Sequence, residues 1–148
     1  MKVLMGIDDS PHSQAAFDFA RVVPWPKDTH FELVSVLKPD VGSYTLVGMP
    51  SPGRAEALVG EETRQQVELV SRLAREMQSR GLDATASTLE GDPRLMLVDA
   101  AKTHNVDLVV VGSHGRSGLS KLILGSVASH LVVHSPCSVL VVKRPPRT

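Results

Sequence analysis

The sequence of 148 residues lacks several features that would narrow its function at once. Its single cysteine, Cys137, excludes an internal disulfide and a zinc site built on cysteines. Its 16 basic and 16 acidic residues balance, so no net field attracts nucleic acid or an anionic membrane surface. No apolar run approaches the roughly 20 residues that a membrane-spanning helix needs, and Met1-Lys2 leads into a short apolar run rather than a signal peptide. We therefore expect a cytoplasmic protein whose partners are small molecules or proteins, with neither nucleic acid nor membrane among them.

Apolar runs and helical patterns alternate along the chain without any internal repeat. A nearly continuous apolar run predicts a buried strand at residues 3–7, and we expect further strands at about residues 31–37, 84–89, 107–111 and 138–142. Apolar residues at helical spacing predict helices at about residues 13–23, 56–80, 93–104 and 126–134. Such alternation predicts an α/β fold, a single doubly wound five-stranded parallel sheet with helices on both faces. Residues 1–148 are too few for two domains of ordinary size, so we expect one domain.

Two places in this pattern point to a binding site. In doubly wound sheets ligands bind beyond the carboxyl ends of the strands, where the winding direction switches. The first and fourth strands would flank that point, and Asp8 follows the first of them. A Pro- and Gly-rich stretch from Lys38 to about Arg54 follows the second strand, and it is either a lid over the site or a surface excursion.

The most informative stretch is a glycine-rich loop after the valine run of residues 109–111. Gly112, two residues, Gly115, nine residues, and then Gly125-Ser126 give a spacing that matches neither G-x-x-x-x-G-K-[ST] nor G-x-G-x-x-G. Glycines let several backbone N–H groups converge on an anion without interfering side chains. A helix that begins at Ser126 adds its unpaired first-turn N–H groups and the positive end of its dipole. The sequence therefore predicts that loop and helix hold a phosphate chain.

Charged and polar residues around the loop leave alternatives open. His114 and Arg116 beside a phosphate chain would suit transition-state stabilisation, but neither comes with a recognisable partner that positions water. Arg116 either neutralises phosphate charge or lies in solvent. Asp8 and Asp9 together would suit magnesium, although adjacent side chains leaving a strand point to opposite faces. We therefore expect Asp8 alone to face the ligand and assign no residue as catalytic or as a metal ligand.

With these residues laid out, the chain resembles the universal stress protein family over nearly its whole length. The nucleotide-binding members carry the spacing that Gly112, Gly115, Gly125 and Ser126 meet without departure. Family-like segments also occur in the same order at residues 3–10, 90–93 and 134–142. The resemblance implies a sheet order of 3-2-1-4-5 and ATP as ligand, with magnesium as its companion ion.

The resemblance also implies which residues surround the nucleotide. Gly6 and Asp8 match first-strand positions that border adenosine, and Val36 matches a second-strand position whose backbone meets adenine. The loop and helix start that receive ribose and phosphates correspond to Gly112, Ser113, His114, Gly115, Arg116, Ser117, Gly125, Ser126 and Val127. Family members often pair through their fifth strands, which implies a homodimer through the apolar edge of Val139, Leu140, Val141 and Val142.

Three functions fit these features. The leading hypothesis is a small ATP-binding stress-response protein that acts as a nucleotide-dependent sensor or regulator, with an unknown protein partner. A slow ATPase is the enzymatic alternative; an adenylyl transferase fits poorly, since its H-x-G-H signature is replaced by Asp9-Ser10-Pro11-His12. The third hypothesis is a dimeric scaffold that binds no nucleotide, against which the intact glycine spacing argues. ATP, ADP and cyclic AMP share adenosine, so the loop does not distinguish them.

Overall fold

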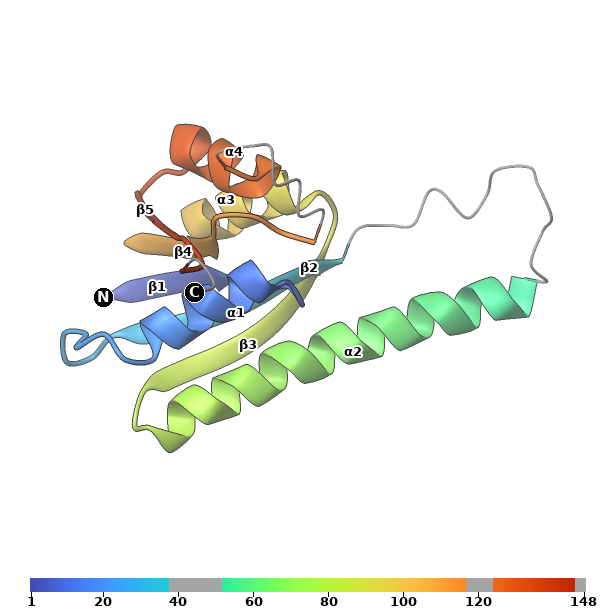
Figure 1. Cartoon of the computed structure of the whole chain (residues 1–148), viewed down its shortest axis with the longest axis horizontal. Coiled ribbons are helices and arrows are strands. Elements are labelled where there is room, and N and C mark those ends of the chain that lie inside the picture. The colour runs from blue at the N-terminus through green and yellow to red at the C-terminus, as the bar shows by residue number, and fades with distance from the viewer. Residues whose placement is uncertain (38–51, 117–123, 146–148) are drawn as a thin grey trace.

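The computed structural model describes residues 1–37, 52–116 and 124–145 (Figure 1). Strands and helices alternate within these ranges. In chain order they are β1 (Lys2–Gly6), α1 (Pro11–Ala20), β2 (His30–Leu37), α2 (Pro52–Ser79), β3 (Asp83–Glu90), α3 (Pro93–Thr103), β4 (Leu108–Gly112), α4 (Ser126–His134) and β5 (Ser138–Val142). The expected stretch from Lys38 to about Arg54 falls mostly on residues 38–51, outside the described residues, and α2 already begins at Pro52.

The five strands form one sheet in the order β3-β2-β1-β4-β5, and every pair of neighbours is parallel. The predicted fold class and strand order are therefore confirmed. The chain winds outward from β1 to β3, returns through α3 to β4 beside β1, and ends at β5. The switch in winding direction lies between β1 and β4, where a ligand crevice is expected.

The two faces of the sheet carry separate apolar cores because alternate residues of each strand point to opposite faces. Met5 and Val110 belong to the core under α1 and α2, which also holds Phe17 and Met77. Their strand neighbours Leu4, Val109 and Val111 belong to the core under α3 and α4, with Leu97 and Leu131. In Figure 1 the long helix α2 runs along β3, while α3 and α4 lie together on the other side of the sheet.

Helix α1 differs from the sequence prediction at both ends, and local contacts explain both differences. It begins at Pro11 because Ser10 is its N-cap and accepts a hydrogen bond from the backbone N–H of Ser13 at 3.1 Å. It ends at Ala20, three residues before the predicted end, where the indole N–H of Trp25 donates to the Ala20 carbonyl oxygen at 2.6 Å. A side chain that returns from beyond the helix thus satisfies one of its last carbonyl groups.

Strand β2 extends beyond the end of its neighbour β1, which leaves backbone groups of β2 unpaired with β1 on that side. β1 pairs with β2 only from His30 to Val34, whereas β3 pairs with β2 as far as Leu37. The N–H of Ile7 donates to the Val34 carbonyl oxygen at 2.8 Å, and backbone groups of a strand alternate between its two neighbours. The N–H and C=O of Val36 therefore face the β1 side of β2 at a level that β1 itself does not reach.

Candidate functional site

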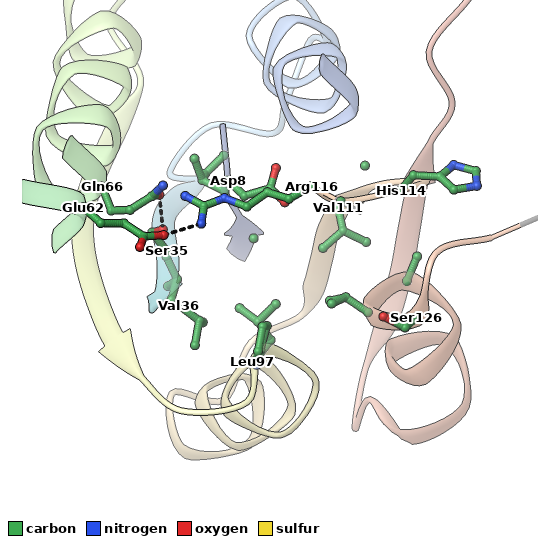
Figure 2. A pocket seen from close by; sticks show the side chains of 18 residues that line it. Asp8, Ser35, Val36, Glu62, Gln66, Leu97, Val111, His114, Arg116 and Ser126 are labelled. Atoms are coloured by element: carbon green, nitrogen blue, oxygen red, sulfur yellow. Dashed lines mark hydrogen bonds and ion pairs between the residues drawn. The ribbon is translucent and has the colours of Figure 1, made fainter. Parts of the chain in front are cut away.

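A cavity of about 180 Å³ opens where β1, β2 and β4 end, at the switch point of the sheet (Figure 2). Residues from both ends of the sequence line it, together with the first turns of α3 and α4 and one face of α2. The lining residues are Gly6, Ile7, Asp8, Val34, Ser35, Val36, Glu62, Gln66, Pro93, Leu97, Val111, Gly112, His114, Gly115, Arg116, Ser126, Val127 and Ala128.

The glycine loop forms one wall, and its glycines are required by close approaches of backbone. A Cβ at Gly112 would lie 2.5 Å from the backbone carbonyl carbon of His12, so only glycine fits where β4 passes the start of α1. A Cβ at Gly125 would lie 3.0 Å from the Cα of His114. The N–H of Gly125 donates to the Ser113 carbonyl oxygen at 2.7 Å, which fixes the start of α4 against the loop.

The start of α4 is open towards the cavity. Its N-cap residue is Gly125, which has no side chain to accept from the first turn, and Ser126 and Val127 line the cavity. Unpaired first-turn N–H groups and the positive end of a helix dipole favour an anion at such a place. The loop and the helix start together form a site whose chemistry suits phosphate.

Asp8 and Asp9 point apart, as the alternation of side chains along a strand predicts. Asp8 lines the cavity, and its Oδ1 accepts a hydrogen bond from the backbone N–H of Ser10 at 2.9 Å. The N–H of Asp8 in turn donates to the Ser13 hydroxyl at 3.0 Å, so the start of α1 holds this carboxylate in place. Asp9 does not line the cavity and instead accepts from the Arg116 guanidinium.

Arg116 is held by two carboxylates rather than lying free in solvent. Its Nε is 2.6 Å from Asp9 Oδ1, and its NH1 is 2.6 Å from Glu62 Oε1 on α2. Burial by itself lowers the pKa of Arg116, but the hydrogen bonds that Arg116 donates to Glu62 and Asp9 outweigh it and raise this pKa above its ordinary value. The Arg116 side chain therefore ties the glycine loop to α2 and to the loop after β1, beside the cavity.

A cluster of two imidazoles and a hydroxyl lies behind the glycine loop. Ser113 is 3% exposed, and its Oγ is 3.3 Å from His12 Nδ1 and 3.2 Å from His114 Nδ1. The two rings lie 4.9 Å apart between centroids. Burial first, and then the nearby charges of His114 and Arg144, lower the pKa of His12 from its ordinary value of 6.5, against a smaller raising effect of Asp8. In Figure 2 His114 extends away from the centre of the cavity.

The opposite wall was not predicted from the sequence. Ser35 on β2 donates its hydroxyl to Gln66 Oε1 on α2 at 2.8 Å, and both side chains are buried. Glu62 and Gln66, one helical turn apart, line the same cavity. No motif in the sequence marks these residues. Polar residues on an amphipathic helix are expected to face solvent, and only the position of β2 beside α2 shows that Gln66 is buried.

The twelve residues predicted for the site occupy three positions relative to the cavity. Nine of them line it: Gly6, Asp8, Val36, Gly112, His114, Gly115, Arg116, Ser126 and Val127. Ser113 and Gly125 lie directly behind the lining, joined by the backbone hydrogen bond described above. Ser117 lies outside the described residues. The sequence also left unassigned the apolar lining residues Val34, Leu97 and Val111, whose side chains shape the floor of the cavity.

Neither a metal cluster nor a membrane-spanning helix is found among the described residues. No three histidine, cysteine, aspartate or glutamate side chains gather there as they would around a metal ion. No helix in the same part of the chain has the length and apolar character needed to cross a membrane.

Fold and cavity together define the class of the chain: an open, doubly wound α/β sheet with a crevice at its switch point and a glycine loop leading into a helix. Comparison with known proteins narrows this class. The model of the universal stress protein family matches residues 1–143. A universal stress protein of Methanocaldococcus jannaschii is 32% identical over 147 residues, which cover 97% of this chain and 82% of the relative. The chain therefore belongs to the universal stress protein family.

Solved structures agree with the fold. Universal stress protein UspA of Lactobacillus plantarum has a TM-score of 0.79 at 22% identity, with 96% of this chain and 97% of that one covered. A universal stress protein family protein of Arabidopsis thaliana, solved with AMP bound, has a TM-score of 0.70 at 19% identity, with 98% of this chain and 92% of that one covered.

Proposed function

We propose that this protein binds an adenine nucleotide, ATP in the first place, in the cavity at the switch point and acts as a nucleotide-dependent regulator in a stress response. The observation that carries the proposal is the conjunction, at one cavity, of an anion-binding helix start at Gly125-Ser126 and an apolar floor around Leu97 and Val36. A nucleoside phosphate needs both, since its base is largely apolar on its faces and its phosphates are charged. The AMP-bound relative of the same fold supports adenine as the base.

The proposed placement follows the two ends of the cavity. The phosphates lie against the glycine loop and the start of α4, where Gly115 and Ser126 stand. Asp8, held by the Ser10 N–H, accepts from ribose hydroxyls. The base lies between Val36 and Leu97, where the N–H and C=O of Val36 offer one donor and one acceptor to the edge of adenine. We expect magnesium to accompany the phosphates, as hard divalent ions prefer oxygen ligands.

The first experiment is mass spectrometry of what the purified protein releases on denaturation, followed by calorimetric titration of stripped protein with ATP and magnesium. Gly115→Val is the matching variant: even its Cβ would lie 3.0 Å from Asp8 Oδ2, so the larger side chain fills the cavity. We expect ATP binding to wild type and its loss in Gly115→Val, with the two circular dichroism spectra alike. Absence of both released nucleotide and heat of binding would favour the scaffold hypothesis.

We further propose that the protein works as a homodimer in the cytoplasm. β5 is the last strand of the sheet, and residues Val139–Val142 on it are only half-buried. A strand at a sheet edge presents unpaired backbone groups that a second copy of the same strand satisfies. Sedimentation equilibrium tests the dimer, and Val141→Pro, which removes a backbone donor from this strand, should shift the protein towards monomer.

A further inference from the structure

Two buried polar side chains lie at the end of the cavity opposite the glycine loop. Gln66 is 4% exposed and Ser35 is 1% exposed, yet both line the cavity. Figure 2 shows Gln66, Ser35 and Val36 on one side, with Ser126 and His114 on the other. Buried polar groups normally have hydrogen-bond partners, so a buried glutamine at a cavity raises the question of what its amide binds.

The hydrogen bond between them uses one half of this amide. In the structure Ser35 Oγ donates to Gln66 Oε1 at 2.8 Å, and the Nε2 amino group of the same amide points the other way. Among the described residues, Nε2 of Gln66 has no hydrogen-bond partner. The Gln66 side chain therefore brings an oriented donor to the cavity, and the ligand atom that satisfies it must be an acceptor.

The position of Gln66 assigns that acceptor to the base. The phosphates belong at the far end, where Gly115 and Ser126 line the cavity. At the near end, Val36 lies next to Ser35 on β2 and presents its backbone to the cavity, with Leu97 completing the apolar floor. In adenine the acceptors are the ring nitrogens N1, N3 and N7.

We propose that Gln66 is a base-binding residue whose Nε2 amino group donates a hydrogen bond to a ring nitrogen of adenine. Ser35 is its positioning residue, since its hydroxyl holds the Gln66 side chain in place through Oε1. This inference rests on the proposed adenine nucleotide site. It adds to that site a contact made by a residue of α2, which lies outside the glycine-rich loop.

The test combines a protein change with a ligand change. ATP and its 1-deaza, 3-deaza and 7-deaza analogues, each lacking one ring nitrogen, are titrated calorimetrically into wild type and into Ser35→Ala/Gln66→Leu. The double variant removes both partners of the buried hydrogen bond, so neither is left unsatisfied. We expect one analogue to bind about five- to tenfold more weakly than ATP in wild type only, the loss of one hydrogen bond, whereas an analogue lacking the nitrogen that the Val36 N–H reaches should bind more weakly in both proteins. The same analogue and ATP should bind the double variant equally.

Two further variants separate the roles. Ser35→Ala alone should weaken ATP binding less than the double variant, with the loss confined to the same ring nitrogen. Gln65→Leu is the matched control, because Gln65 is the next residue on α2, is exposed, and donates to Glu61 Oε1 at 3.1 Å. It should bind all four nucleotides as wild type does.

Failure takes distinguishable forms. If wild type binds ATP and every deaza analogue loses the same factor in wild type and in the double variant, the Gln66 contact is refuted while the nucleotide site stands. If stripped wild type binds none of the four nucleotides, the proposed function fails and this inference fails with it.

Discussion

The two walls of the cavity are built in different ways. The glycine-loop wall consists mainly of backbone that approaches other backbone, as where Gly112 passes His12 and Gly125 meets Ser113. The α2 wall consists of side chains, where Glu62 and Gln66 reach across to Arg116 and Ser35. Backbone contacts of the first kind tolerate only glycine, whereas side-chain contacts of the second kind tolerate exchange at a smaller cost. We therefore expect the glycine-loop wall to be rigid and the α2 wall to be adjustable.

The largest effect is expected at Gly112. Gly112→Ala places a Cβ 2.5 Å from the His12 carbonyl carbon and 2.6 Å from its oxygen, and backbone cannot yield as a flexible side chain can. We expect the free energy of unfolding to fall by about 3 kcal/mol, the upper part of the range for overpacking. Urea denaturation measures it. Gly115→Ala is the matched control, since its Cβ would meet only the tip of Asp8 at 3.0 Å and should cost far less. Equal losses in both variants would contradict the contrast.

The same difference decides what the sequence could predict. The sequence predicted four residues of the glycine-loop wall: Gly112, Gly115, Gly125 and Ser126. A backbone that must lie close to an anion or to another backbone requires glycine, and glycines at a fixed spacing are visible in the sequence. The apolar run at residues 3–7 likewise predicted a strand buried on both faces, and the alternation of strands with helices predicted a parallel sheet, while the strand order came from the family resemblance.

No comparable sequence pattern marks the residues of the α2 wall. Gln66 and Ser35 are 31 residues apart, and either one alone is an ordinary polar residue. Their pairing depends on how α2 lies across β2, which no local pattern encodes. The end of α1 was predicted too late for a different reason, because the apolar spacing runs on to Val23 while the nearby Trp25 side chain already bonds the Ala20 carbonyl oxygen.

The second prediction tests whether the backbone of α2 at Gly60 follows ordinary helix propensity, with no contact that requires glycine. Gly60 lies inside α2, and a Cβ there would meet nothing within 4 Å. Gly60→Ala should therefore raise the free energy of unfolding by about 0.5 to 1 kcal/mol through helix propensity alone. Gly81 just after α2 has φ of +81°, so Gly81→Ala should lower it instead. Thermal denaturation compares the three proteins, and a destabilised Gly60→Ala would mean that this glycine is needed for contact.

The third prediction tests whether the α2 wall competes with phosphate for Arg116. Glu62→Gln removes one of the two carboxylates that hold the guanidinium, which frees it to turn towards the phosphates that we propose to lie at Gly115. We expect ATP to bind about threefold more tightly, within the range measured for partly exposed ion pairs. Glu61→Gln is the control with the same charge change, one residue earlier on α2 and 3.9 Å from Arg64. Tighter binding in both variants would show a general charge effect in place of competition for Arg116.

The smallest effect is expected from lowering the pH, which should reduce the free energy of unfolding through His12, beside the glycine-loop wall. Burial, His114 and Arg144 lower the pKa of His12 below 6.5 in the folded protein, so the folded state resists protonation there more than the unfolded chain does. As the pH falls below the unfolded pKa of about 6.5, the unfolded state binds the proton first and this share of stability is lost. His114→Gln removes the second largest cause, and NMR titration of the His12 ring protons should show the pKa of His12 rising towards 6.5. Urea midpoints should then fall less between about pH 7.5 and pH 5.5 in His114→Gln than in wild type. An unchanged His12 titration in the variant would mean that the imidazole pair is not electrostatically coupled, and that burial and Arg144 lower the pKa of His12 without His114.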